Sequence, residues 1–236
     1  MMYDYLAPYY DALVADEEAT KAWVSLIEDY IPKGDLMELA CGSGEITIML
    51  AEHGYQVYAS DLSSEMVEQA KQKAGSEKVT WSVMDMSHIE DDRQYDGIVC
   101  LCDSFNYLLN EEAIHSMFQG VHAHLKENGI FIVDMHSLDR IEEFEEEYNE
   151  AGKLFGHEYQ WSIQSEDDLI YQNFSFYDED GRCTLEQHIQ RVYDPMWVLE
   201  TLESYGFECE VLTDFELEGI QPGEKYFFIC KKGNMK

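Results

Sequence analysis

The stretch LMELACGSGE, residues 36–45, decides the fold of this chain. Its apolar start, Leu36 to Ala40, predicts a buried strand, which breaks into a Gly-x-Gly turn at Gly42 and Gly44. Residues 46–51 then predict a helix with one apolar face. Glycine permits positive φ and lets a ligand approach the backbone closely. A strand, a tight turn and a helix in this order are typical of the start of a nucleotide-binding α/β domain.

The ligand class follows from the residues around the turn. A dinucleotide-binding fingerprint places a third glycine three residues after the second, and Thr47 stands there instead. With the acidic Glu38 near the end of its strand, the stretch resembles motif I of the class I S-adenosylmethionine (SAM)-dependent methyltransferases. The resemblance implies a Rossmann-like α/β fold with a mostly parallel seven-stranded sheet, and SAM as the cofactor. Ala40 replaces the family's first glycine. The implied cofactor contacts in this stretch are Glu38, Ala40, Cys41, Gly42, Ser43 and Gly44.

A second predicted strand, residues 55–61, ends in an acid. Asp61 follows Gly44 by 17 residues, close to the roughly 20 expected for a carboxylate that reaches a ribose hydroxyl. The alternative is that Asp61 caps the next helix, but Ser63 fits that cap better. The resemblance extends through this segment and implies that Leu62 and Met66 pack near the adenine.

A third predicted strand, residues 79–83, leads to Asp85 and Met86. By resemblance, Asp85 accepts a hydrogen bond from the adenine amino group, and the backbone N–H of Met86 meets a ring nitrogen. Taken alone, Asp85 would be read as an acid on a surface loop. Its place directly after the third strand favours the adenine role.

The fourth and fifth predicted strands, residues 95–102 and 130–134, bring the reacting groups together. Open α/β sheets bind ligands at the carboxyl edge, where both strands end. The methionine part of SAM is therefore expected near Leu101 and Cys102. We expect an acceptor pocket lined by Asp103, Tyr107 and His136. His136 is the candidate general base. Asp103 can orient it or pair with a cationic amine, and Tyr107 can supply a hydrogen bond or a cation–π face. The alternative is that His136 only holds its own loop.

The N-terminal segment, residues 3–13, is rich in tyrosine. Tyr3 and Tyr10 are seven residues apart and would share one face of a helix. Similar segments in small-molecule methyltransferases lie over the cofactor, so the resemblance implies that both tyrosines contact SAM. The alternative is a helix that simply packs on the domain.

The pattern changes after strand five. Residues 142–147 form an acidic run to which no function is assigned, and three alternating segments follow at 159–163, 169–177 and 183–193. They predict an antiparallel β insertion, which in related methyltransferases caps the active site. A dimerisation sheet, and hence a homodimer, is the alternative. The expected division is a SAM-binding core with its N-terminal segment (1–137), an inserted cap (138–193), and a C-terminal helix with closing strands (194–236).

The composition of the chain limits the kinds of partner that it can bind. The 236 residues include 49 acidic and 15 basic side chains, for a net charge of −34. Nucleic-acid binding depends on neutralising phosphates, so we expect no nucleic-acid partner. No apolar run reaches 18 residues and the first residues do not resemble a signal peptide, so we expect no membrane contact and a cytoplasmic location. The six cysteines form no Cys-x-x-Cys pair and are expected to be buried thiols. Cys100 and Cys102 would share one face of a strand, but no metal site is expected.

The sequence thus predicts a SAM-dependent methyltransferase that acts on a small-molecule acceptor. Two alternatives stay open. The first is a non-catalytic SAM- or nucleotide-binding protein with a protein partner. The second is a nucleotide-dependent oxidoreductase, against which the missing third glycine and the Asp85-Met86 pair argue.

Overall fold

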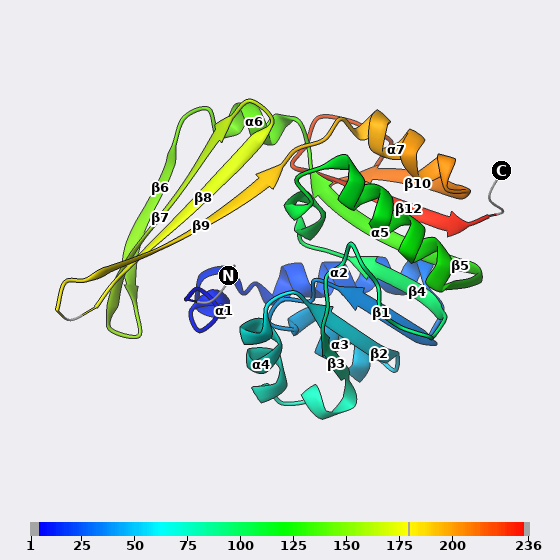
Figure 1. Cartoon of the computed structure of the whole chain (residues 1–236), viewed down its shortest axis with the longest axis horizontal. Coiled ribbons are helices and arrows are strands. Elements are labelled where there is room, and N and C mark those ends of the chain that lie inside the picture. The colour runs from blue at the N-terminus through cyan, green and yellow to red at the C-terminus, as the bar shows by residue number, and fades with distance from the viewer. Residues whose placement is uncertain (1–4, 179, 234–236) are drawn as a thin grey trace.

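A computed structural model describes residues 5–178 and 180–233 (Figure 1). Its main sheet has eight strands in the order β11-β10-β12-β5-β4-β1-β2-β3. The strands are β1 (Asp35–Leu39), β2 (Gln56–Asp61), β3 (Thr80–Val83), β4 (Tyr95–Cys100), β5 (Leu125–His136), β10 (Phe207–Thr213), β11 (Leu217–Glu218) and β12 (Lys225–Lys232). Strands β1 to β5 run parallel, and β12 pairs antiparallel with β5 and β10. The expected Rossmann-like sheet is confirmed, and the two-residue β11 extends one edge.

Helices cover both faces of this sheet. Trp23 and Ile27 of α2 (Glu17–Tyr30) and Leu50 of α3 (Glu45–Glu52) pack on one face. Phe118 of α5 (Glu111–His124) and Leu202 of α7 (Pro195–Ser204) pack on the other. Because both faces are buried, the central strands read as continuous apolar runs. The remaining helical elements are α1 (Tyr10–Val14), α4 (Ser64–Gln72), α6 (Asp139–Glu143), η1 (Ser76–Lys78) and η2 (Ser104–Tyr107).

Helix starts follow the capping residues of the sequence. The Ser63 hydroxyl accepts the N–H of Met66, so Ser63, and not Asp61, caps α4. Asp194 caps α7, with Pro195 at the first helical position. This capping leaves the Asp61 carboxylate outside the helix, at the end of β2.

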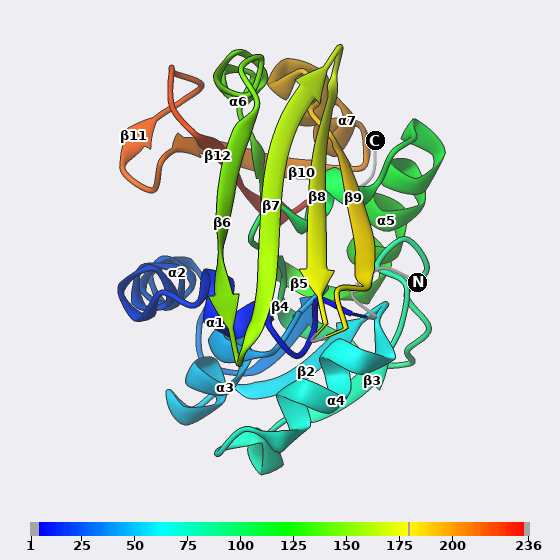
Figure 2. The ribbon, with the colours of Figure 1, turned by 90° about the vertical axis from the view of Figure 1, so that its left-hand side faces the viewer.

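The insertion between β5 and α7 forms a second sheet with the order β6-β7-β8-β9, and every neighbouring pair is antiparallel. Its strands are β6 (Tyr148–Leu154), β7 (His157–Glu166), β8 (Leu169–Tyr177) and β9 (Cys183–Arg191). Figure 2 shows them as long strands standing in front of the core. The prediction of three strands was one short. The signal of β6 is weak because it carries polar and small residues, and it forms by pairing with β7.

Three local predictions need correction. Tyr3 lies outside the described residues, and α1 begins only at Tyr10, after turns at residues 5–9. β4 ends at Cys100, and Cys102 has a φ of 58°, so the two cysteines do not share a strand face. The expectation of six buried thiols also fails. Of the cysteines, Cys41 and Cys100 are buried and free, Cys102 and Cys183 are exposed, and Cys209 and Cys230 are joined by a disulfide.

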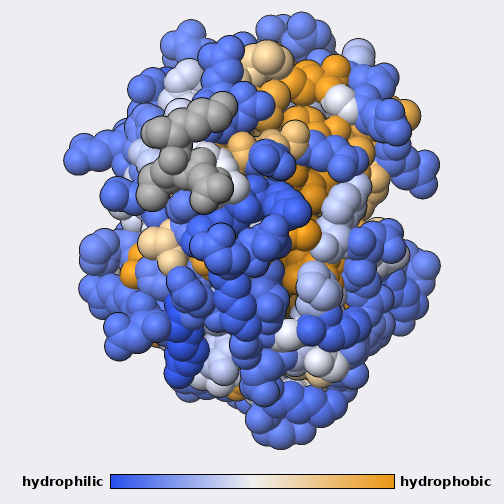
Figure 3. Space-filling view, turned by 90° about the vertical axis from the view of Figure 1, so that its right-hand side faces the viewer, coloured by the Kyte–Doolittle hydropathy of each residue, from blue (hydrophilic) through white to orange (hydrophobic). Residues whose placement is uncertain are grey.

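The surface reflects the composition. The face turned away from the insertion is mostly hydrophilic, interrupted by an apolar strip in its upper part (Figure 3). Among the described residues, no helix is long and apolar enough to cross a membrane.

Candidate active site

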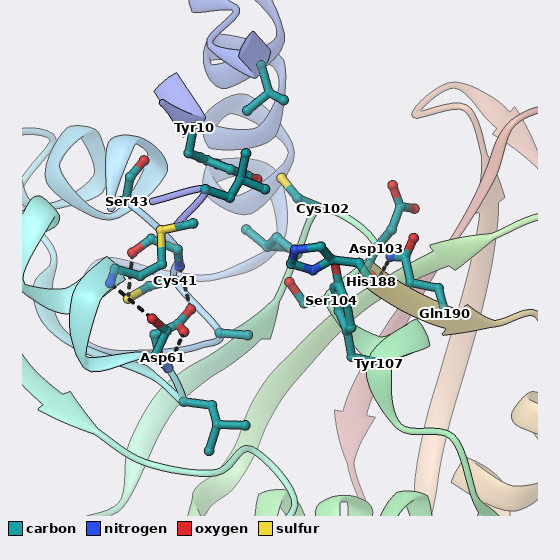
Figure 4. A pocket seen from close by; sticks show the side chains of 18 of the residues that line it. Tyr10, Cys41, Ser43, Asp61, Cys102, Asp103, Ser104, Tyr107, His188 and Gln190 are labelled. Atoms are coloured by element: carbon teal, nitrogen blue, oxygen red, sulfur yellow. Dashed lines mark hydrogen bonds between the residues drawn. The ribbon is translucent and has the colours of Figure 1, made fainter. Parts of the chain in front are cut away.

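A cavity of about 950 Å³ lies where the carboxyl ends of β1, β2 and β4 face the inserted sheet. The glycine turn and the loops after β2, β3 and β4 line one half of it. The loop after β5 and the inner faces of β7, β8 and β9 line the other half, and α1 lies beside both. Figure 4 shows the two groups, with Asp61 and Ser43 on one side and Tyr107 and His188 on the other. All the expected site residues in the described part of the chain line this cavity.

The glycine turn is held in a left-handed conformation. Ala40, Gly42 and Gly44 have φ values of 54°, 54° and 78°. A Cβ on Gly44 would lie 2.5 Å from the indole of Trp81, so only glycine fits there without a rearrangement. Ala40, where the family has its first glycine, holds positive φ although it carries a side chain. A Cβ on Gly42 would meet nothing within 4 Å, so the backbone at that position is open to a ligand.

Asp61 ties two loops together. Its carboxylate oxygens accept the N–H of Gly42 and the N–H of Ser63, each at 2.8 Å. Burial raises the pKa of Asp61, although the backbone N–H donors oppose that shift. Each carboxylate oxygen has a second lone pair, so the side chain can still accept hydrogen bonds from ligand hydroxyls.

Glu38 is buried at the end of β1 and accepts the Thr47 hydroxyl at 2.6 Å. Burial raises the pKa of this carboxyl to about 7. A cationic ligand placed nearby would favour its ionised form. Thr47 therefore stands where a dinucleotide site has its third glycine, and its hydroxyl donates a hydrogen bond to Glu38, the acid of motif I.

The loops after β2 and β3 form a mixed apolar and polar wall. Leu62 is 55% exposed, whereas Met66 is fully buried, and both line the cavity. Asp85 turns one carboxylate oxygen to the N–H and hydroxyl of Ser87. Met86 follows it on the same wall, next to Cys100.

The N-terminal segment is fastened to the glycine turn. The Ser43 hydroxyl donates to Asp11, and Lys73 from the end of α4 pairs with the same carboxylate at 2.7 Å. Tyr10, which precedes Asp11, lines the cavity near Cys102 and Tyr107. Burial raises the pKa of the Tyr10 phenol, which keeps the hydroxyl protonated.

Behind the loop after β4 lies a buried charged cluster. The Lys225 ammonium is 2.9 Å from Asp103 Oδ2 and 3.2 Å from Asp134 Oδ2. His136 Nδ1 is 3.4 Å from Asp103 Oδ1, and its Nε2 is 3.2 Å from the side-chain oxygen of Gln190. Burial lowers the pKa of His136, so the ring is neutral at neutral pH. Asp103 itself has a φ of 60°, and its N–H donates to Asp134. The cluster thus supports a left-handed turn at the cavity wall.

Sequence reasoning missed the polar side chains of β9. Glu186, His188 and Gln190 all lie on the buried face of the inserted sheet. His188 Nδ1 is 3.2 Å from the Tyr107 hydroxyl, and His188 Nε2 is 2.7 Å from Glu186 Oε1. Their alternation with Leu185 and Ile189 would instead place the polar side chains on the exposed face, so the sequence pattern gave no signal for their burial.

We call the half of the cavity that is lined by the glycine turn and the loops after β2, β3 and β4 the cofactor half. Its residues fit SAM by the chemistry of their groups. SAM offers ribose hydroxyls, amino groups and a sulfonium cation, and the wall offers the carboxylates of Glu38, Asp61 and Asp85 as acceptors. Leu62 and Met66 supply apolar surface for an aromatic base. The left-handed glycine turn leaves its backbone open beside them.

Comparison with known proteins agrees with this geometry. Residues 36–129 match a family model described as a methyltransferase domain. The chain is 34% identical to YqeM of Bacillus subtilis (strain 168), a protein provisionally named as a methyltransferase, over 98% of each chain. A crystal structure of a SAM-dependent methyltransferase from Clostridium acetobutylicum ATCC 824 matches with a TM-score of 0.83 and 27% identity, covering 98% of this chain and 99% of the other. The sugar N-methyltransferase KedS8 from Streptoalloteichus sp ATCC 53650 shares the fold, with a TM-score of 0.79 and 20% identity over 99% and 94% of the two chains. The chain therefore belongs to the class I SAM-dependent methyltransferases.

Proposed function

We propose that this enzyme transfers the methyl group of SAM to a small-molecule acceptor bound beneath the inserted sheet. One observation carries the proposal. A continuous cavity of about 950 Å³ runs from Asp61 in the core to Trp161 on the inner face of β7. Small-molecule sites occupy roughly 300–1,000 Å³, so a cavity at the upper end of this range has room for the cofactor and a second small molecule.

The cofactor half is assigned by position and chemistry. We assign the ribose hydroxyls to Asp61, and the adenine edge to Asp85 and the backbone of Met86. The remaining proposed cofactor contacts are Glu38, Ala40, Cys41, Gly42, Ser43, Gly44, Leu62, Met66, Leu101, Cys102 and Tyr10, all of which line the cavity. The net charge of −34 also favours a cationic ligand over an anionic one. When bound, SAM supplies an electrophilic methyl group on sulfur, and the protein supplies binding and orientation.

The acceptor half has a polar floor and an aromatic roof. Asp103, Tyr107 and His136 are proposed to line the floor. Both ring nitrogens of His136 already face protein groups, Gln190 and Asp103, so we assign His136 to the pocket wall. Trp161 stacks on Phe174 in the roof, with ring centroids 5.3 Å apart. Alignment of the nucleophile with the methyl group can contribute on the order of 7–11 kcal/mol, so positioning by these walls is the main catalytic device.

The roof also argues against a macromolecular acceptor. Residues of the inserted sheet and of α1 line the cavity opposite the core, so a folded RNA or protein would have to reach past them. KedS8, which shares the fold along nearly its whole length, is named a sugar N-methyltransferase, and this supports an acceptor of small size.

The test is a transfer assay with SAM labelled in its methyl group and a small-molecule cell extract freed of protein and nucleic acid. We expect label in the small-molecule fraction together with S-adenosylhomocysteine. Asp61→Ala should lose most of this transfer at limiting SAM, whereas Asp92→Ala, at an exposed loop aspartate, should retain it.

Two results would contradict the proposal. Label that enters added tRNA or protein, and not the extract, would point to a macromolecular acceptor. Tight SAM binding without transfer to any fraction would favour the non-catalytic binding protein.

A further inference from the structure

The inner face of β9 carries a row of polar side chains that binding of SAM does not explain. His188 is 1% exposed and Glu186 is 8% exposed, and they share their sheet face with buried aromatic side chains such as Tyr159 and Phe174. Burying such groups is unfavourable unless each finds a partner. The partners that they find connect the sheet to the cavity floor.

The hydrogen bonds fix the protonation state of the ring. Glu186 Oε1 lies 2.7 Å from His188 Nε2, and an ionised carboxylate can only accept. His188 Nε2 must therefore carry the proton in the neutral ring. Nδ1 is then an acceptor, and it faces the Tyr107 hydroxyl at 3.2 Å. Tyr107 and His188 both line the cavity, on the side away from Asp61 and Ser43 (Figure 4).

Glu186 is held in place by more than the histidine. Its second oxygen accepts the backbone N–H groups of Tyr5 and Leu6, at 2.9 and 3.0 Å. Burial alone would raise the pKa of Glu186, but the hydrogen bonds from His188, Tyr5 and Leu6 lower it. The carboxylate thus stays ionised beside the ring, and it also fastens the N-terminal segment over the cavity.

We propose that Tyr107, His188 and Glu186 form a relay that removes a proton from the acceptor during methyl transfer. The inference rests on the proposed function and narrows the acceptor class to a protonated amine, whose nitrogen gains its attacking electron pair when the proton leaves, or a hydroxyl, which loses its proton as the oxygen attacks. Tyr107 is the catalytic residue that touches the acceptor, His188 receives the proton, and Glu186 is a positioning residue.

Methyl transfer and proton transfer occur together in this step. The acceptor nitrogen or oxygen forms a bond to the methyl carbon, and the carbon–sulfur bond breaks with its electrons remaining on sulfur. The acceptor proton passes to the Tyr107 oxygen as the Tyr107 proton passes to His188 Nδ1. The resulting imidazolium is stabilised by the Glu186 carboxylate at 2.7 Å. The proton returns to solvent after the products leave.

The groups around His188 support this direction of transfer. Phe174 of β8 presents its ring to the histidine at 5.6 Å, edge to face, and thereby excludes water on that side. Tyr107 faces it from η2 and Glu186 from β9. The two ring nitrogens thus face a hydroxyl and a carboxylate, as the proposed relay requires.

The first test needs no acceptor. Enzyme labelled with ¹⁵N in histidine and saturated with S-adenosylhomocysteine is examined by long-range ¹H–¹⁵N correlation, with His188→Asn assigning the ring. We expect the Nε2–H tautomer at neutral pH, and a shift of Nδ1 in Tyr107→Phe. An Nδ1–H tautomer, or a ring that stays doubly protonated through the pH range of activity, would overturn the relay.

The second test uses the labelled-SAM assay with the small-molecule extract. Tyr107→Phe and His188→Asn should each lower transfer roughly 10²–10⁴-fold, and the double variant should lose little more, because the two groups act as a unit. Calorimetry should show that both single variants bind S-adenosylhomocysteine with unchanged affinity. His136→Asn should keep the wild-type pH profile even where its rate falls, whereas His188→Asn should change that profile.

The outcomes separate the two proposals. Transfer close to wild type in His188→Asn would overturn the relay while leaving the proposed function intact. Failure of the wild type to label the small-molecule fraction would refute the proposed function, and the tautomer measurement would still decide whether the relay is assembled.

Discussion

Replacing Lys225 with methionine removes the cation that two buried carboxylates share. Its ammonium lies 2.9 Å from Asp103 Oδ2 and 3.2 Å from Asp134 Oδ2, and Asp134 is 0% exposed. The other oxygen of each aspartate, Oδ1, is buried without a hydrogen-bond partner. Breaking a buried pair by removing one partner destabilises proteins by about 3–5 kcal/mol, because a charge is left uncompensated. We expect the free energy of unfolding to fall by that amount near pH 8.

The loss should depend on pH, and its sign follows from Asp134. Burial raises the pKa of Asp134 from 3.8 to about 7, although Lys225 lowers it. A carboxyl whose pKa is raised in the folded state contributes stability that is present below its unfolded pKa and lost as pH rises through the folded value. Without Lys225 the folded pKa of Asp134 rises further, so the variant protonates Asp134 more readily. The destabilisation should therefore be smaller near pH 6 than near pH 8.

The measurement is urea unfolding followed by circular dichroism at both pH values. Lys21→Met is the matched control, because Lys21 pairs with Glu17 and Glu18 on the exposed side of α2 and should change stability by less than about 1 kcal/mol. Adding Asp134→Asn to Lys225→Met should recover part of the loss. A single variant as stable as the control near pH 8, or a loss that does not change with pH, would refute this account of the cluster.

Three further predictions concern ligands and partners. Asp61→Ala should weaken SAM binding by about 1–3 kcal/mol in calorimetry, and unchanged affinity in a folded variant would remove Asp61 from the ribose role. At physiological salt the protein should not retain tRNA or duplex DNA in filter binding, and tight binding with a steep salt dependence would contradict the small-molecule assignment. If the outer face of β6–β9 forms a homodimer, Leu185→Glu should halve the mass measured by light scattering, because Leu185 is 73% exposed on that face. A wild-type protein that is already monomeric would contradict this prediction.

The core could be predicted from local sequence because its signals are local. The apolar run before Gly42, the turn itself and the following helix lie within one short segment, and the acids Asp61 and Asp85 each follow a recognisable strand. Residues at the ends of neighbouring parallel strands must meet at one edge of the sheet. Position along the chain was therefore enough to bring these side chains to one cavity.

The insertion was predictable only in part, for a physical reason. β7 and β8 alternate clearly, whereas β6 is polar and small and is specified by its pairing with β7. His188 reaches Tyr107 only because the whole sheet folds back over the core, across 81 residues of chain. Such a contact depends on tertiary packing, and no local pattern encodes it. The sequence pointed to His136, the histidine at the end of the core strand β5.

The core, which local sequence predicts, and the insertion, which it predicts only in part, also have different roles in the proposed mechanism. The core contributes the cofactor half of the cavity through residues at strand ends. There Asp61 joins the glycine turn to the loop after β2 by accepting the N–H groups of Gly42 and Ser63. The insertion contributes the aromatic roof and His188, the proposed proton acceptor. Glu186 links the insertion to the N-terminal segment, because one oxygen holds His188 and the other accepts the N–H groups of Tyr5 and Leu6. Changes on the inner faces of β7 and β8, and at His188, should therefore alter acceptor choice and proton transfer together while leaving SAM affinity unchanged. Changes at Glu186 should also release the N–H groups of Tyr5 and Leu6, in the segment that carries Tyr10, a proposed SAM contact.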